Sequence, residues 1–120
     1  MFIQSEPAEK NSIESYDENS IVISAETYAR PVFICAEKII DLPLETKLAT
    51  IDFSFLAKLE PKIMQLINVL LIGHSTILTP TQFMSFNEKG IGLESMQRGA
   101  ACRTFNLLLS EYRKVGLILL

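Results

Sequence analysis

An alternation of apolar strands and helices over residues 68–120 constrains the fold most. The run over residues 68–72, NVLLI, is apolar almost throughout and ends at Gly73, which is typical of a central strand covered on both faces. This βαβαβ pattern predicts parallel strands joined by helical crossovers. Its later segments are a helix from about residue 79, a strand over residues 91–96, a helix over about residues 99–113 and a strand over residues 115–120.

The first of these helices carries signals at both ends. Thr79 can cap it, Pro80 takes its first helical position and Gln82 completes a capping box. Gly90 can close it as a left-handed residue. We therefore expect a helix bounded by Thr79 and Gly90.

The first part of the chain reads as short strands. β-Branched and apolar residues predict strands over residues 21–23, 32–35 and 38–40. Ala25 and Glu26 are expected to form the turn after the first of them. N-terminal strands followed by a βαβαβ half define an α/β chain.

Length and composition limit the number of domains and the class of protein. With 120 residues, of which 48% are hydrophobic and 21% charged, the chain has room for one core. We expect a flexible N-terminus over residues 1–11 and a single domain over residues 12–120. The formal net charge of −3 argues against a nucleic-acid-binding protein. The N-terminus lacks the basic start and apolar run of a signal peptide, and no apolar stretch is long enough to span a bilayer, so we expect a cytoplasmic protein.

Charge is unevenly distributed along the chain. Acidic residues dominate residues 1–20, whereas cations outnumber acids from Lys89 onward. An anion or an acidic partner would favour the C-terminal end.

Cysteine and histidine are too few for a zinc site of the usual kind. The chain contains only Cys35 and Cys102, with no CxxC pair, and the single histidine His74. The phosphate-binding loops GxxxxGKS/T and GxGxxG are both absent. The sequence therefore predicts neither a metal nor a cofactor.

Two loops leave the carboxyl ends of the predicted parallel strands, where ligands gather in sheets of this kind. One loop is residues 73–75, and the other is residues 96–99, which lead into the last helix. If the strands are neighbours, both loops meet at one edge of the sheet, which we call the rim. The candidate rim residues for binding a ligand or partner are Gly73, His74, Ser75, Gln97, Arg98, Gly99, Cys102 and Arg103.

Cys102 has two interpretations. In the first turn of a helix the partial positive charge can lower the pKa of a thiol, and His74 could then serve as the base of a nucleophile–base pair. Alternatively, Cys102 continues an apolar stripe with Phe105 and Leu109 and is buried, while His74 is a polar loop residue. Free cysteines behave mostly as small hydrophobic residues, which favours the second interpretation.

The arginines of the rim also have two interpretations. Arg98 and Arg103, with the free N–H groups at Ala100 and Ala101, could hold a phosphate or a carboxylate. The alternative is that Arg103 is a surface residue or pairs internally with Glu94.

Some apolar residues have more than one possible role. Ile13 and Tyr16 could be contacts of a homodimer, because the early strands carry more apolar residues than one small sheet face needs. The methionines expected to fill the core are Met64, Met84 and Met96.

Residues 69–73 and 90–113 carry a family resemblance. The second segment reads GIGLESM over residues 90–96 and AACRTFN over residues 100–106, followed by Glu111 and Arg113. In these motifs the chain resembles the family of mitochondrial respiratory complex I assembly factor 3 and its bacterial relatives, whose biochemical activity is undefined. The resemblance implies a compact three-layer α/β domain with a mixed β-sheet.

The departures from the family pattern lie on or near the rim. The usual G-T-G reads Gly73-His74-Ser75, the usual threonine is Arg98, and the usual glycine before Arg113 is Tyr112. If family members share a small-molecule site built from those small residues, these substitutions alter or remove it.

The resemblance implies a non-catalytic interaction or assembly factor for membrane protein complexes of the respiratory type. Its partners would be proteins, including membrane-complex subunits or a second copy of the chain. It would then act in the cytoplasm or at the periphery of the inner membrane. The alternative is a small anionic-ligand-binding protein or an enzyme that uses residues 73–75 and 96–103.

Overall fold

The computed structural model describes residues 11–120. The flexible segment predicted over residues 1–11 lies outside this range except for Asn11, whose side-chain amide donates to the carbonyl oxygen of Cys35 at 2.7 Å. The elements in chain order are β1 (Ser15–Tyr16), β2 (Ser20–Ile23), β3 (Glu26–Ala29), β4 (Val32–Cys35), β5 (Ile39–Asp41), the 3-10 helix η1 (Leu48–Thr50), α1 (Phe53–Leu59), α2 (Ile63–Leu66), β6 (Val69–Gly73), α3 (Pro80–Asn87), β7 (Gly92–Met96), α4 (Arg98–Ser110) and β8 (Val115–Leu119).

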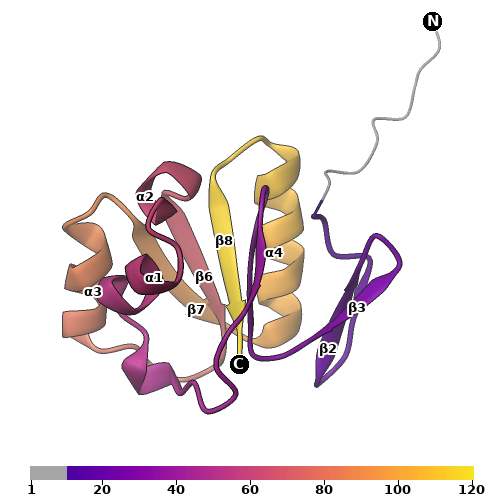
Figure 1. Ribbon diagram of the computed structural model, residues 1–120, viewed down its shortest axis with the longest axis horizontal. Coiled ribbons are helices and arrows are strands. Elements are labelled where there is room, and N and C mark those ends of the chain that lie inside the picture. The colour runs from indigo at the N-terminus through magenta and orange to yellow at the C-terminus, as the bar shows by residue number, and fades with distance from the viewer. Residues whose placement is uncertain (1–10) are drawn as a thin grey trace, which may run out of the picture.

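A five-stranded mixed sheet forms the centre of the molecule (Figure 1). Its strand order is β5-β4-β8-β6-β7. β6 is parallel to both β7 and β8, whereas β4 is antiparallel to both β5 and β8. The predicted βαβαβ half and the mixed sheet are therefore confirmed.

Helices cover both faces of this sheet. α1, α2 and α3 pack on one face, while α4 and a small antiparallel sheet, β1-β2-β3, pack on the other (Figure 1). Successive residues of a strand point to opposite faces. Leu70 and Ile72 of β6 therefore pack in the core under α1, α2 and α3, and Leu71 packs in the core under α4 and the small sheet. The result is the expected three-layer α/β architecture.

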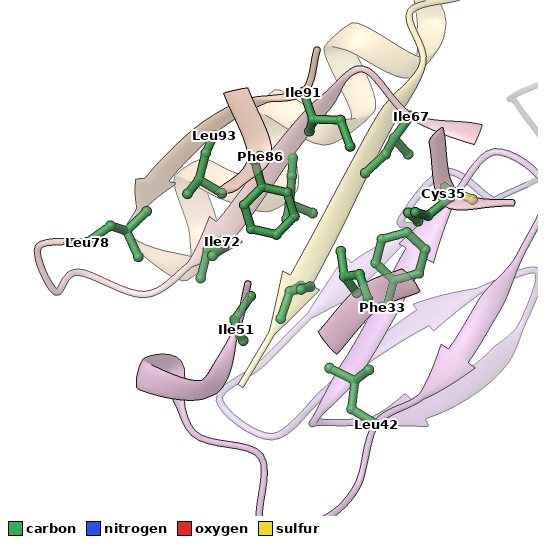
Figure 2. Close-up of a cluster of buried hydrophobic side chains, with 14 residues drawn as sticks. Phe33, Cys35, Leu42, Ile51, Ile67, Ile72, Leu78, Phe86, Ile91 and Leu93 are labelled. Atoms are coloured by element: carbon green, nitrogen blue, oxygen red, sulfur yellow. The ribbon is translucent and has the colours of Figure 1, made fainter. Parts of the chain in front are cut away.

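Two phenylalanines organise the core beneath α1, α2 and α3. Figure 2 shows Phe86 of α3 and Phe33 of β4 among aliphatic side chains from the sheet and the loops around it. Phe86 also meets Phe53 of α1 edge to face, with ring centroids 6.3 Å apart. This aromatic contact joins α1 to α3 above the sheet.

The signals that predicted α3 form as expected. Thr79 Oγ1 accepts a hydrogen bond from the Gln82 N–H at 3.1 Å, and Gln82 Oε1 accepts one from the Thr79 N–H at 2.9 Å. The buried Gln82 amide also donates to the carbonyl oxygens of Leu48 and Ile51, which fixes η1 against α3. Gly90 has the predicted left-handed conformation, with φ of 76°.

The hairpin between β2 and β3 turns one residue earlier than the sequence suggested. Ser24 and Ala25 form the turn, with φ values of 51° and 66°, and Glu26 already belongs to β3 opposite Ile23. A two-residue turn with both residues left-handed suits the twist of a hairpin. The prediction that Ala25 and Glu26 form this turn is therefore wrong by one position.

The prediction that the methionines fill the core is wrong for two of the three. Met64 is 54% exposed and Met84 is 58% exposed, because each lies on the solvent side of a short helix. Met96 is partly buried against the core beside α4. Ile13, considered above as a dimer contact, is buried in that same core.

Replacing Tyr112 with glycine is expected to raise the free energy of unfolding by about 1 kcal/mol. Tyr112 follows α4 with φ of 61°, in a C-terminal motif where its N–H donates to Leu109 and the Arg113 N–H donates to Leu108. Glycine adopts this conformation without steric cost, and the Tyr112 ring, 77% exposed, adds little packing. Urea unfolding measures the difference. Tyr112→Ala is the control, because it removes the ring but keeps the side-chain carbon, and equal stability of the two variants would contradict the argument.

Candidate functional site

The two loops of the rim lie next to each other. β6 and β7 are paired in parallel, with Gly73 opposite Met96, so the segments after them leave the sheet at one edge. A Cβ atom built on Gly73 would lie 3.5 Å from Arg98 Cα and 3.5 Å from Ala101 Cβ. The first turn of α4 therefore packs directly over the end of β6.

The two arginines of the rim bind a segment of the chain itself. Arg103 Nη1 donates to the hydroxyl oxygen of Tyr16 at 2.8 Å, and Arg98 Nη2 donates to the carbonyl oxygen of Glu18 at 2.8 Å. One alternative for Arg103 was an exposed residue or an internal pair with Glu94. Arg103 is exposed, and the hydrogen bonds of the described residues join it to Tyr16 and not to Glu94. We call residues 13–18 the arm.

The arm is anchored to α4 by a partly buried side-chain amide. Asn106 accepts a hydrogen bond from the Ile13 N–H through Oδ1 and donates to the Ile13 carbonyl oxygen through Nδ2, both at 2.8 Å. Gly99 leaves room for the arm, because a Cβ atom there would lie 2.8 Å from the Tyr16 hydroxyl oxygen. The arm thus runs along α4 from its middle to its N-terminus.

Arg98 is the most unusual polar group of the rim. Its Nη1 atom is buried and has no hydrogen-bond partner among the described residues. Burial lowers the pKa of this guanidinium, and the nearby charge of Arg30 lowers it further. Asp17 lies close by, and hydrogen bonds from the N–H groups of Asn19 and Ser20 lower the pKa of its carboxyl group.

Cys102 is buried rather than reactive. Its side chain is 1% exposed and packs in the core with Phe105 and Leu109, so the stripe predicted for these residues is confirmed. Burial raises the pKa of the Cys102 thiol to about 11, although Arg98 and Arg103 act in the opposite direction. Desolvation therefore outweighs the helix dipole that the sequence suggested.

Cys102 is expected to react with an aromatic disulfide reagent at pH 8 at least about 100-fold more slowly in the native protein than in urea. The physical reason is that its pKa is about 11 in the folded protein against 9.0 for an ordinary thiol. Its burial adds a steric barrier. Cys35→Ser allows the Cys102 thiol to be followed alone by absorbance, and fast labelling of the folded variant would contradict this assignment.

His74 and Cys102 do not form a pair. His74 is exposed, and its Nδ1 atom accepts a hydrogen bond from the Thr76 N–H at 3.2 Å. The two side chains of a nucleophile–base pair must lie within hydrogen-bond reach, and no such bond joins Cys102 and His74 in the described part of the chain. His74 is thus the polar loop residue of the second interpretation.

The remaining rim residues divide into exposed and packed ones. Ser75 and Gln97 are exposed, and Gln97, the N-cap residue before α4, makes no side-chain capping hydrogen bond. Gly73 is buried against Leu119 and Ala101, so its small size serves packing. Ile77, just beyond Ser75, is 90% exposed, and the sequence reasoning did not single it out.

The sequence did not predict that the arm binds the rim, although it singled out Ile13 and Tyr16 of the arm as possible dimer contacts. The signal that could have found it is the charge asymmetry, since the arm comes from the acidic N-terminal part and its contacts are arginines of the basic C-terminal part. Within residues 11–120, no three His, Cys, Asp or Glu side chains gather where they could hold a metal ion. None of the helices in that range has the length and hydropathy that a bilayer span requires.

Solved structures share this fold. A crystal structure of a Bordetella parapertussis protein has 28% sequence identity and a TM-score of 0.75, over 92% of this chain and 94% of that one. A solution structure of a Bordetella pertussis protein described as an Mth938-like domain has 23% identity and a TM-score of 0.76, over 100% of this chain and 92% of that one. A crystal structure of a Bartonella henselae protein described as an outer membrane protein has 24% identity and a TM-score of 0.75, over 93% of this chain and 95% of that one. The last two, at this level of identity, support the fold alone.

Family membership follows from the sequence match. No curated protein matches the chain. Residues 13–120, which include the arm, the sheet and the whole rim, match the family described as protein of unknown function (DUF498/DUF598). The chain belongs to this family.

Proposed function

We propose that the protein is a non-catalytic interaction factor that helps to assemble membrane protein complexes of the respiratory type. The observation that carries the proposal is the way the rim holds the arm. Arg98 and Arg103 each use a guanidinium N–H to bind polypeptide, one at a backbone carbonyl oxygen and one at a side-chain hydroxyl. The same groups suit a protein partner with acidic and hydroxyl side chains.

The chemistry of the rim supports binding over catalysis. Its thiol has a pKa of about 11, and the neighbouring His74 makes its hydrogen bond to the backbone of Thr76. His74, Ser75 and Ile77, in the loop after β6, are exposed and combine polar and apolar side chains. Surfaces of this kind are typical of protein contacts.

The respiratory and membrane part of the proposal rests on the motifs over residues 90–113. In these motifs the chain resembles complex I assembly factor 3, an assembly factor for a membrane enzyme. On this basis the protein acts in the cytoplasm or at the periphery of the inner membrane. It binds subunits of a membrane complex, and a second copy of the chain is a further candidate partner.

The test is affinity capture from the protein's own cells, with membranes solubilised and partners identified by mass spectrometry. Arg103→Ala is expected to lose membrane-complex subunits that the unmodified protein captures. Tyr16→Phe is the matched variant, because it removes the hydroxyl that occupies Arg103 and leaves the guanidinium in place. It should retain or increase the capture. Loss of capture in both variants, or in neither, would count against a rim that binds partners.

The alternative function is binding of a small anion at the same rim. The observation in its favour is the buried Nη1 atom of Arg98, which lacks a partner among residues 11–120. If this alternative holds, phosphate or citrate raises the melting temperature and Arg103→Ala abolishes that rise. A flat thermal-shift screen with both anions would reject it.

A further inference from the structure

A groove separates two open strand edges on the side of the molecule that carries the small sheet. β3 is the outer strand of the small sheet, and β5 is the outer strand of the central sheet. A pocket of about 420 Å³ spans the two strands, and a second pocket of about 290 Å³ continues it past Tyr28. The larger pocket is lined by Thr27, Tyr28, Ala29, Arg30, Pro31, Asp41, Leu42 and Leu44.

Within residues 11–120, the register of β3 leaves backbone groups free for pairing. Arg30 N–H donates to the carbonyl oxygen of Asn19 at 3.0 Å, and Tyr28 lies opposite Ile21. Because hydrogen-bonded pairs alternate along an antiparallel ladder, Thr27 and Ala29 point their N–H and C=O groups away from β2. These groups face the groove.

The same reasoning applies to β5 on the other wall. Leu42 N–H donates to the carbonyl oxygen of Pro31, and Cys35 N–H donates to that of Lys38. Ile39 and Asp41, between those positions, therefore turn their backbone groups outward. Unpaired edges of this kind accept an extended segment as an added strand.

The groove has an apolar part and an acidic part. Leu44 is 86% exposed at its mouth, beside the half-buried Pro31 and the buried Leu42. Among the described residues, the charged side chains of the lining are three acids and one arginine. Asn19 holds the arginine through two hydrogen bonds of 3.1 and 3.3 Å. The acids are Glu26, Glu37 and Asp41.

This charge selects the occupant. A second copy of the chain would bring Glu26 and Asp41 of its own edges against the same acids, which is unfavourable. A segment with lysine or arginine between apolar residues places cations on the acids and apolar side chains beside Leu44.

We propose that the groove between β3 and β5 binds an extended segment of a partner protein in which apolar residues alternate with lysine or arginine. The segment pairs with the outward backbone groups of Thr27 and Ala29. The groove borders the rim at Arg30, whose charge lies near Arg98, but the segment binds at strand edges that the rim does not use. This binding therefore goes beyond the function proposed for the rim.

The test uses the acetylated and amidated peptide KVTVKVT, followed by backbone amide NMR of the full chain. We expect saturable shifts centred on Thr27, Ala29 and Asp41. The acidic peptide EVTVEVT is the matched probe and should produce no saturable shifts. Shifts centred outside the groove, equal shifts with both peptides, or no saturation at millimolar peptide would overturn the proposal.

Variants at the edge separate backbone pairing from side-chain contacts. Ala29→Pro removes an N–H that the β2–β3 ladder does not use, and should weaken peptide binding about tenfold, the cost of about one hydrogen bond. Ala29→Ser keeps the N–H and should bind normally. If the NMR spectrum shows that Ala29→Pro is unfolded, Asp41→Lys is used in its place. Reversing this exposed charge should also weaken the binding of the cationic peptide. Unchanged affinity in a folded Ala29→Pro protein would contradict strand pairing, and unchanged affinity in Asp41→Lys would contradict the choice of a cationic segment. Arg103→Ala should leave the affinity unaltered.

Discussion

Replacing Phe105 with alanine is expected to lower the free energy of unfolding by about 3–5 kcal/mol. Phe105 lies in the middle of α4 with its side chain 0% exposed. It packs in the core that α4 shares with the central sheet and the small sheet, together with Leu71 and Leu117. Truncation removes apolar contact on all sides and leaves a cavity that the surrounding strands cannot collapse to fill. Urea unfolding followed by circular dichroism measures the loss.

Leu107→Ala is the matched control on the same helix. Leu107 is 57% exposed, so its truncation should change the free energy of unfolding by no more than about 0.5 kcal/mol. Comparable losses for the two variants would mean that the buried face of α4 is wrongly assigned. A loss of stability in Phe105→Ala alone would show that α4 packs on the core through the face that carries Phe105.

Replacing Gly73 with valine is expected to lower the free energy of unfolding by about 1–3 kcal/mol. An added Cβ atom would lie 2.5 Å from Leu119 Cδ2, and the branched methyl groups of valine would extend further toward Ala101 and Arg98. Leu119 is 1% exposed, so it has little space into which to move. Gly73→Ala should cost less, because one methyl group requires only the end of the Leu119 side chain to turn.

Gly92→Val provides the control for strand glycines. Gly92 begins β7 at the edge of the sheet, and the nearest atom to an added Cβ is Asn68 O at 3.9 Å. Valine also favours extended backbone, so this variant should be neutral or slightly stabilising. A Gly73→Val protein as stable as Gly92→Val would argue that Gly73 is kept small for another reason, such as room for a ligand at the rim.

The elements of the second half of the chain could be predicted because their signals are local. The Thr79 and Gln82 capping box, the left-handed Gly90 and the NVLLI run each report on their own few residues. Parallel pairing of the strands follows from the βαβαβ order by general rules of chain connection. The mixed sheet came from the family resemblance, and the structure bears it out.

The first half was predicted less well, since its local signals are weaker. A turn of two left-handed residues without glycine, Ser24 and Ala25, has no distinctive sequence, which placed the predicted turn one residue too late. Met64 and Met84 are exposed because α2 and α3 are short and only part of each reaches the core. Periodicity over so few residues does not identify the buried side of a helix.

The sequence by itself determined the order of strands and helices from residue 68 onward and the place where two strand ends meet. Only the tertiary structure decided the state of the groups gathered there. Cys102 has a raised pKa because the surrounding core desolvates it, and burial is a property of packing rather than of position in a helix. Arg98 and Arg103 bind Glu18 and Tyr16, which lie 80 and 87 residues earlier in the chain, because the small sheet carries the arm to the start of α4. Contacts over such sequence separations depend on how the layers pack, which no local pattern encodes.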